Sequence, residues 1–329
     1  MRIRTLAAGA LATLAGLAVA VSPAEAAATH APHLARTLAP RSHSNAASPA
    51  ASSANDLSYG GGPVATAPTV YIVYYGSQWG TGSTVTSDPS GEAALQLSFF
   101  QHAYGSGDTY FTSQTQYCQG VASGTTQCNG AGTAVGHPSS NPVKGTWLDS
   151  AAKAPTRPSD AQLAAEAVKA AAHFGVSGDN IQVIVDSPHG VVPSGFGTQY
   201  CAWHDQTSSS SGAPVPYTNM PYITDAGSSC GAGFVSATNG VNSADEGITI
   251  VGGHEYSETL TDPAAGNGWL DSSGYETGDK CAWISSGQGA SAVIALNGSY
   301  FAVQSEWSNN YGGGAGNCVT FYSSASNQH

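Results

Sequence analysis

The stretch GGHEYSETLTDP, residues 252–263, holds the side chains best suited to chemistry. On a helix, His254 and Glu258 lie one turn apart on the same face, where both can reach one metal ion. This spacing is that of the HExxH zinc motif with a glutamate in place of the second histidine, and a glutamate oxygen is an acceptable zinc ligand. We therefore expect His254 and Glu258 to bind Zn²⁺, and Glu255 to act as the general base that takes a proton from water.

A zinc site of this kind needs a third protein ligand from elsewhere in the chain. Asp262 lies at the end of the same predicted helix, whereas Glu276 and Asp279 lie in the following loop and could return across it. The sequence leaves these three carboxylates open as alternatives. Such a concentration of acidic side chains repels itself unless a cation or water offsets it, which favours metal binding. Eight of the 21 acidic residues fall within residues 245–279: Asp245, Glu246, Glu255, Glu258, Asp262, Asp271, Glu276 and Asp279.

Two alternative interpretations remain open. Asp271, Glu276 and Asp279 offer only oxygen ligands, which suit a hard cation such as Ca²⁺, so the loop could hold structural calcium in a non-catalytic binding or signalling protein. A metal-free glutamic peptidase could instead be built on Gln304 and Glu306, which lie two residues apart and therefore on one face of a strand.

The helix that must position these side chains has signals at both ends. Ser243 and Glu246 have the spacing of a capping box, with serine at the N-cap and glutamate at the N3 position. Pro263 stands where a helix cannot continue, so the pattern predicts a helix over residues 244–261. The glycine pair at 252–253 costs roughly 1 kcal/mol per glycine relative to alanine, which indicates close approach by a substrate strand or a neighbouring element.

The first half of the chain predicts an α/β (α+β) fold, a single layered domain with a mixed sheet. Residues 69–75 and 181–185 are β-branched and aromatic runs typical of buried strands. Residues 92–104 carry a helical apolar stripe. A capping box also opens an alanine-rich helix over residues 159–174, which stops at a glycine.

The second half combines a long loop region with a hairpin. Residues 191–234 are rich in Gly, Ser, Pro and aromatic side chains, and we expect loops with short strands there. His189 and His204 could contribute to a site, but exposed loop histidines are the simpler interpretation. Residues 290–296 and 300–304 predict a hairpin around an Asn-Gly turn.

The N-terminal residues indicate an exported protein. Residues 1–26 combine two arginines, an apolar run and an Ala-x-Ala cleavage site, the pattern of a secretory signal peptide. Residues 27–58 are rich in Ala, Ser and Pro and predict a disordered linker or propeptide. This leaves residues 59–329 as a single globular domain, secreted to the cell exterior.

Six cysteines in an exported chain predict three disulfides. We expect nearest-neighbour pairing because each such pair encloses a loop rich in Gly and Ser. None of the cysteines has the CxxC spacing of a metal site, so we do not expect cysteine ligands. The expected pairs are Cys118–Cys128, Cys201–Cys230 and Cys281–Cys318.

The charge balance restricts the partners of the chain. Its net charge is −12, and only nine residues are basic. Scattered cations cannot follow a phosphate backbone, so we do not expect nucleic acid or anionic membranes as partners. After the signal peptide, no stretch approaches the about 18 apolar residues of a membrane helix, and we expect no membrane insertion. A monomer that acts on a polypeptide or another substrate at the cell exterior fits these limits.

Several segments together resemble the EXORDIUM-like (phosphate-induced protein) family of secreted proteins and its bacterial relatives. They are TVYIVYYG, QVIVDSPHG, YCAWHD, GGHEYSETLTDP and GNGWLDSSGYETGDKCAW, and the resemblance covers residues 70–307. The resemblance implies secretion and association with the cell exterior, and plant members are linked to growth and nutrient responses. In bacterial relatives an HExxE helix is followed by a T-[DN]-P turn, a Gly-Trp pair and an E-x-G-D-x-C loop. Here these are His254, Glu255, Glu258, Thr261–Pro263, Gly268-Trp269, Glu276, Gly278-Asp279 and Cys281.

Overall fold

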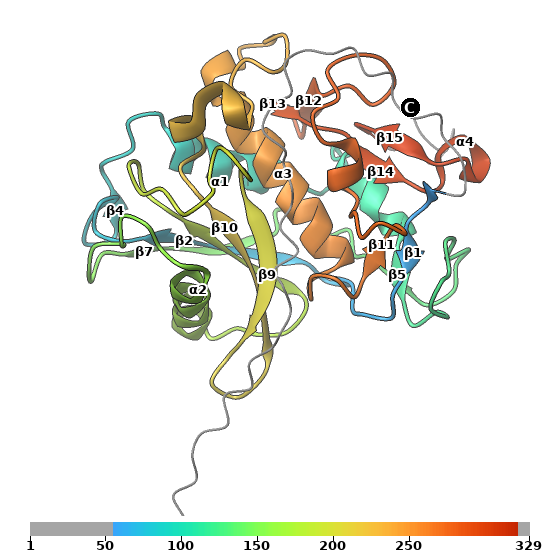
Figure 1. The fold of residues 1–329 in the computed structure, drawn as a ribbon, viewed down its shortest axis with the longest axis horizontal. Coiled ribbons are helices and arrows are strands. Elements are labelled where there is room, and N and C mark those ends of the chain that lie inside the picture. The colour runs from blue at the N-terminus through green and yellow to red at the C-terminus, as the bar shows by residue number, and fades with distance from the viewer. Residues whose placement is uncertain (1–54, 322–329) are drawn as a thin grey trace, which may run out of the picture. The chain divides into compact units, whose positions relative to one another are not determined.

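The structure is a computed structural model that describes residues 55–321, all within one compact unit. Its main sheet consists of β2 (Thr69–Tyr75), β7 (Val143–Asp149), β8 (Ile181–Asp186), β9 (Trp203–Ser208) and β10 (Pro214–Met220). The strand order is β7-β2-β8-β10-β9 (Figure 1). The first four run parallel to one another, and β9 is antiparallel to β10. The predicted α+β fold with a mixed sheet is confirmed.

Helices cover both faces of this sheet (Figure 1). They are α1 (Glu92–His102), α2 (Asp160–Phe174) and α3 (Glu246–Thr261), with a single further turn at α4 (Tyr311–Gly314). Phe174 of α2 contacts Tyr71 of β2 on one face, with 5.0 Å between ring centroids. On the other face, Gln182 of β8 donates to the hydroxyl oxygens of Thr218 in β10 and Thr259 in α3. The helix with the HExxE motif therefore lies directly on the sheet.

Short strand pairs and 3₁₀ helices complete the chain. The pairs are β1 (Ser58–Tyr59) with β11 (Trp269–Leu270), β3 (Gly80–Thr81) with β4 (Thr84–Val85), β5 (Cys118–Gln119) with β6 (Thr133–Ala134), β12 (Ala292–Leu296) with β13 (Ser299–Val303), and β14 (Glu306–Ser308) with β15 (Asn317–Val319). The 3₁₀ helices are η2 (Phe111–Gln116), η3 (Ile223–Cys230), η4 (Ser243–Asp245) and η5 (Asp279–Cys281). The predicted Asn-Gly hairpin is confirmed as β12 and β13. Ser58, the last residue of the predicted linker, is already paired in β1, whereas residues 1–54 lie outside the described part of the chain.

The helix starts follow the expected signals at α2 but not at α3. At α2 both bonds of the capping box are present, and the helix ends at Gly175 in the left-handed conformation. At α3 the predicted capping box on Ser243 is wrong. The chain enters through η4, so the Asn242 side chain accepts the first amide, that of Ala244. The Glu246 carboxylate accepts the backbone N–H of Val235 instead of turning back to the cap.

The region predicted as a long loop with short strands supplies strands of six and seven residues, β9 and β10, which belong to the main sheet. The side chains of β9 are largely polar and do not give the apolar pattern by which a strand is predicted from sequence. They are tolerated because β9 is an edge strand. Pro214 and Pro216 at the start of β10 argue against a strand at the sequence level. However, β10 pairs with β8 only from Tyr217 onward. Pro216 therefore interrupts no hydrogen bond to β8.

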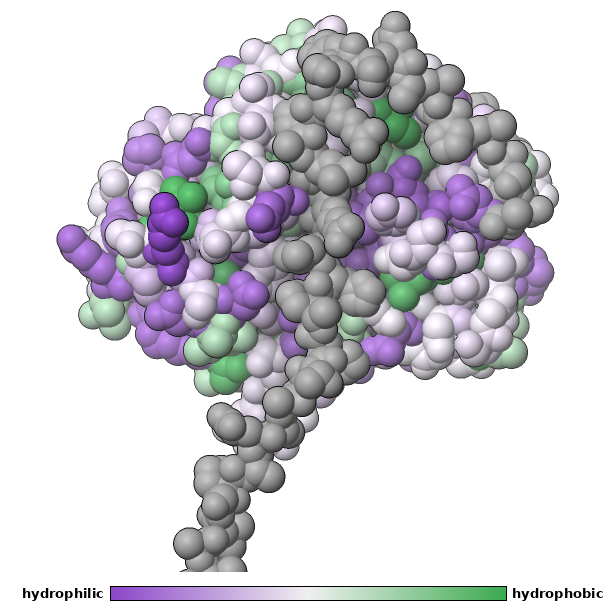
Figure 2. Space-filling view, in the orientation of Figure 1, coloured by the Kyte–Doolittle hydropathy of each residue, from purple (hydrophilic) through white to green (hydrophobic). Residues whose placement is uncertain are grey.

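All three expected disulfides are present: Cys118–Cys128, Cys201–Cys230 and Cys281–Cys318. Three disulfides indicate an oxidising environment. Among the described helices, none is both long and apolar enough to span a membrane. Hydrophilic and hydrophobic residues are interspersed over the face drawn in Figure 2. The large apolar side chains exposed on the described surface are Val192, Tyr275, Tyr300 and Phe321.

The glycine pair of α3 does admit close neighbours, which are aromatic side chains and, at Gly252, also Met220. A Cβ atom on Gly253 would lie 3.1 Å from the hydroxyl of Tyr110 and 3.3 Å from the ring of Phe99. A Cβ atom on Gly252 would meet Phe100 at 3.8 Å, an ordinary contact. Packing against these rings accounts for Gly253, whereas Gly252 has room for a methyl group.

Replacing Gly252 with alanine is expected to raise the free energy of unfolding by about 1 kcal/mol, because alanine is the better helix former and its methyl group fits. Gly253→Ala should gain less, because Tyr110 or Phe99 must move. Urea unfolding of the purified protein followed by circular dichroism measures both changes. Equal gains at the two positions would contradict this packing.

Candidate metal centre

The residues of α3 that could do chemistry are buried. Every residue of this helix is buried, because the sheet lies on one side and α1, η3 and the β12–β13 hairpin lie around the rest. His254 and Glu255 are each 1% exposed and Glu258 is fully buried. Ionisable groups at such depth need charged or hydrogen-bonding partners. The partners determine what this site can bind.

His254 and Glu258 lie together as the spacing predicts, and Asp279 joins them. The Nε2 atom of His254 is 3.1 Å from Oε1 of Glu258 and 3.8 Å from Oδ1 of Asp279. One ligand atom from each of these three residues lies within 4.8 Å of the other two, so the group could hold a metal ion. Among the three carboxylates considered as the third ligand, Asp279 is the one in this group.

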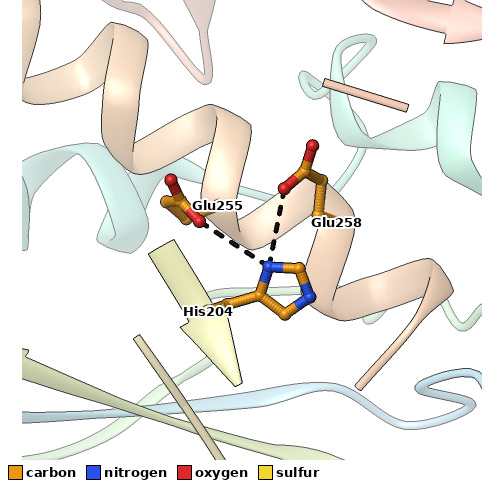
Figure 3. Close-up of side chains that lie close together, drawn as sticks. All are labelled: His204, Glu255 and Glu258. Carbon is orange, nitrogen blue, oxygen red and sulfur yellow. Dashed lines mark ion pairs between the residues drawn. The ribbon is translucent and has the colours of Figure 1, made fainter. Parts of the chain in front are cut away.

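A second group forms around His204, which the sequence interpretation treated as an exposed loop histidine. His204 lies in β9 and is 1% exposed, so that interpretation was wrong. Its Nδ1 atom is 3.6 Å from Oε2 of Glu255 and 3.5 Å from Oε2 of Glu258 (Figure 3). These three residues could also hold a metal ion.

The strand register explains why His204 faces the helix. His204 is paired with Thr218 of β10, whose hydroxyl contacts Gln182 on the face covered by α3. Paired residues in neighbouring strands point to the same side of a sheet. A prediction of residues 203–208 as a strand paired with β10 would therefore have placed His204 on the face covered by α3. His189 is exposed as expected and contacts Asp225 instead.

Glu276 and Asp262 lie beside the two groups but belong to neither. Oε1 of Glu276 is 3.6 Å from Nε2 of His204. The Asp262 carboxylate accepts the backbone N–H groups of Gly266 and Asn267, at 2.6 and 3.1 Å for Oδ2, and so closes its own loop. Its carbonyl oxygen accepts a hydrogen bond from Nε2 of His204 at 3.2 Å. Asp262 thus orients a histidine from outside the two groups.

The side chains of the alternative sites have other partners. Asp271 accepts a hydrogen bond from Lys280 at 2.9 Å and from two amides of its own loop. Within residues 55–321, Asp271, Glu276 and Asp279 do not converge as a metal-binding group. Gln304 donates to the carbonyl of Gly278, whereas Glu306 accepts from the hydroxyl of Tyr110.

We call His204, His254, Glu255, Glu258, Glu276 and Asp279 the carboxylate–histidine cluster. Burial alone would raise the pKa of Glu258, but His254 and His204 stabilise its charged form and lower the pKa to about 2. Burial alone would lower the pKa of each histidine, but the surrounding carboxylates raise both pKa values well above the usual range. The cluster therefore favours positive charge at its centre.

Several buried atoms of the cluster also lack a hydrogen-bond partner. Most buried polar atoms in folded proteins have at least one, so such a concentration requires an explanation. A metal ion in either group would satisfy the atoms of that group that face it, because nitrogen lone pairs and carboxylate oxygens are its ligands. They are Nδ1 of His204, both ring nitrogens of His254, both oxygens of Glu255, Oε2 of Glu258 and Oε1 of Glu276.

The loop that carries Asp279 is held tightly over α3. A Cβ atom on Gly278 would lie 2.8 Å from Nδ1 of His254 and 3.0 Å from Oε1 of Glu258, so only glycine fits there. The Asp279 amide donates to Oε1 of Glu258 at 3.0 Å, and the Cys281–Cys318 disulfide follows directly. This close approach positions Asp279 beside His254.

Comparison with protein-family models, curated proteins and solved structures finds no match to this chain. The function of the centre is therefore inferred from its own geometry.

Gly278→Ala is expected to destabilise the protein by about 1–3 kcal/mol, the usual cost of adding a methyl group to a packed interior. The backbone at Gly278 is in the right-handed helical region, where alanine is free of strain, so the effect comes from contact with His254 and Glu258. Urea unfolding measures the change, and Gly252→Ala serves as the control with room for its methyl group. Unchanged stability would show that the loop does not press on the histidine.

Proposed function

We propose that this chain is a secreted, metal-dependent hydrolase with polypeptide substrates. The observation that carries the proposal is the convergence of His254, Glu258 and Asp279, with the carboxylate of Glu255, which makes no hydrogen bond, on the same helix. One imidazole and two carboxylates form a ligand set that zinc accepts. We therefore propose that this group binds Zn²⁺, and we call His254, Glu258 and Asp279 the first metal position.

His254, Glu258 and Asp279 would hold the divalent metal ion, which would supply Lewis-acid activation of water and of the scissile carbonyl. Glu255 accepts the proton that water loses as it adds to the carbonyl carbon. The proton then passes to the amine as the C–N bond breaks. His204, 3.6 Å from Glu255, holds this carboxylate in place. A peptide bond is the proposed substrate because the HExxE spacing parallels that of HExxH zinc peptidases.

The proposal of secretion rests on two separate observations. Three disulfides in the described residues indicate oxidising surroundings. The N-terminal residues of the sequence also have the pattern of a signal peptide. The resemblance to EXORDIUM-like proteins implies the same compartment.

A second candidate is a non-catalytic, metal-stabilised protein of the cell exterior, with a binding or signalling role as the EXORDIUM-like resemblance implies. Deep burial of the centre favours it, because His204, His254 and Glu255 are each only 1% exposed. A structural metal is closed off by protein ligands, whereas a catalytic metal keeps a position open to substrate. The two candidates differ in what Glu255 does.

Under the hydrolase proposal, Glu255→Gln is expected to lower peptidase activity of the zinc-loaded protein by about 100-fold or more, because the general base is lost. Zinc at the first metal position should be retained, whereas His254→Ala should lose it. Activity on a mixed peptide library, read by mass spectrometry, and zinc content measure these effects.

His189→Ala, which changes an exposed histidine far from the motif in sequence, serves as the control and should behave like the unsubstituted protein. A zinc-loaded protein that cleaves no peptide, and whose thermal stability depends on zinc with or without the Glu255 substitution, would favour the structural role. A protein that never takes up zinc would exclude zinc in both roles.

A further inference from the structure

We propose that the carboxylate–histidine cluster holds two divalent metal ions bridged by Glu258. The inference rests on the proposed function for its first metal position, formed by His254, Glu258 and Asp279. The second metal position is formed by His204, Glu255 and the other oxygen of Glu258. The centre would then be a two-metal hydrolytic site in place of a single-zinc one.

The two oxygens of Glu258 face different histidines. Oε1 is 3.1 Å from Nε2 of His254 and accepts the Asp279 amide at 3.0 Å. Oε2 is 3.5 Å from Nδ1 of His204 and has no hydrogen-bond partner. A carboxylate placed in this way can give one oxygen to each of two ions, and two-metal sites hold their ions about 3.5–4 Å apart.

The hydrogen bond made by His204 prepares it as a ligand. A carbonyl oxygen can only accept, so the bond to the Asp262 carbonyl places the proton on Nε2 of His204. In the neutral imidazole that binds metal, Nδ1 then carries the lone pair, and it points toward Glu255 and Glu258 (Figure 3). Metal-binding histidines usually donate their second nitrogen to a carbonyl or carboxylate in this manner.

The atoms around the second metal position are buried and unpartnered. Nδ1 of His204, both oxygens of Glu255 and Oε2 of Glu258 make no hydrogen bond. All three side chains are at most 1% exposed. These atoms come from β9 and from two positions of α3, so the arrangement is not a surface concentration of acidic residues. One oxygen of Glu255 can bind an ion while the other remains available for a proton.

The formal charges of the cluster match two divalent ions. Its carboxylates are Glu255, Glu258, Glu276 and Asp279, and its two histidines are neutral when they bind metal. Without metal, burial raises the pKa of Glu255, Glu276 and Asp279. With all four carboxylates ionised, one divalent ion would leave excess negative charge in a desolvated interior, which is costly. Two such ions would neutralise the four carboxylates.

Metal counting on the full exported chain tests the proposal. The protein is stripped with a chelator and titrated with Zn²⁺, and the bound ions per chain are counted by native mass spectrometry. We expect two ions per chain, falling to one in His204→Ala and one in Glu255→Gln, with His189→Ala still binding two. Circular dichroism checks that each variant is folded, and the isosteric Glu255→Gln change serves if His204→Ala is not.

Loading with Co²⁺ tests whether the ions share a bridge. Two Co²⁺ ions joined by a carboxylate couple magnetically, so the electron paramagnetic resonance signal per cobalt should be weaker in the unsubstituted protein than in singly loaded Glu255→Gln. A single bound ion in the unsubstituted protein would overturn the second metal position and leave the proposed function standing. Two ions without coupling would overturn the bridge, and no bound ion would overturn both proposals.

Discussion

The buried negative charge of Glu258 is the constraint on which this structure depends. A carboxylate without water is stable only when positive charge or strong donors surround it. Glu258 is surrounded by His254 of its own helix, by His204 of the sheet and by the backbone amide of Asp279, in the loop that covers α3 (the covering loop). The sheet, α3 and the loop that carries Asp279 must therefore all be in place before this charge can be buried.

The surrounding architecture serves the same requirement. Because α3 is covered on all sides, its polar residues are fixed by packing as well as by each other. Aromatic rings from α1 and Tyr110 fit against the glycine pair and set the depth of the helix. On the opposite side, Gly278 brings the covering loop into direct contact with His254. Glycines in α3 and in the loop that carries Asp279 thus allow close packing against this helix.

Local patterns in the sequence predict the local part of this design. Short-range rules predict the i,i+4 pair of His254 and Glu258, the inner strands β2 and β8, the Asn-Gly hairpin and the disulfide pairs. His204 was missed because its role depends on the pairing of an edge strand, which polar residues disguise. The choice among the predicted third ligands likewise depends on loop closure: Asp262 binds amides of its own turn, whereas Asp279 returns to the helix. Such long-range contacts leave no periodic signal.

The Cys281–Cys318 disulfide lies two residues beyond Asp279 and ties the end of the covering loop to β15. As long as these thiols are reduced, the loop relies on hydrogen bonds alone to keep Asp279 at the helix. The disulfide therefore adds a covalent restraint to the loop that holds Asp279 beside His254 and Glu258.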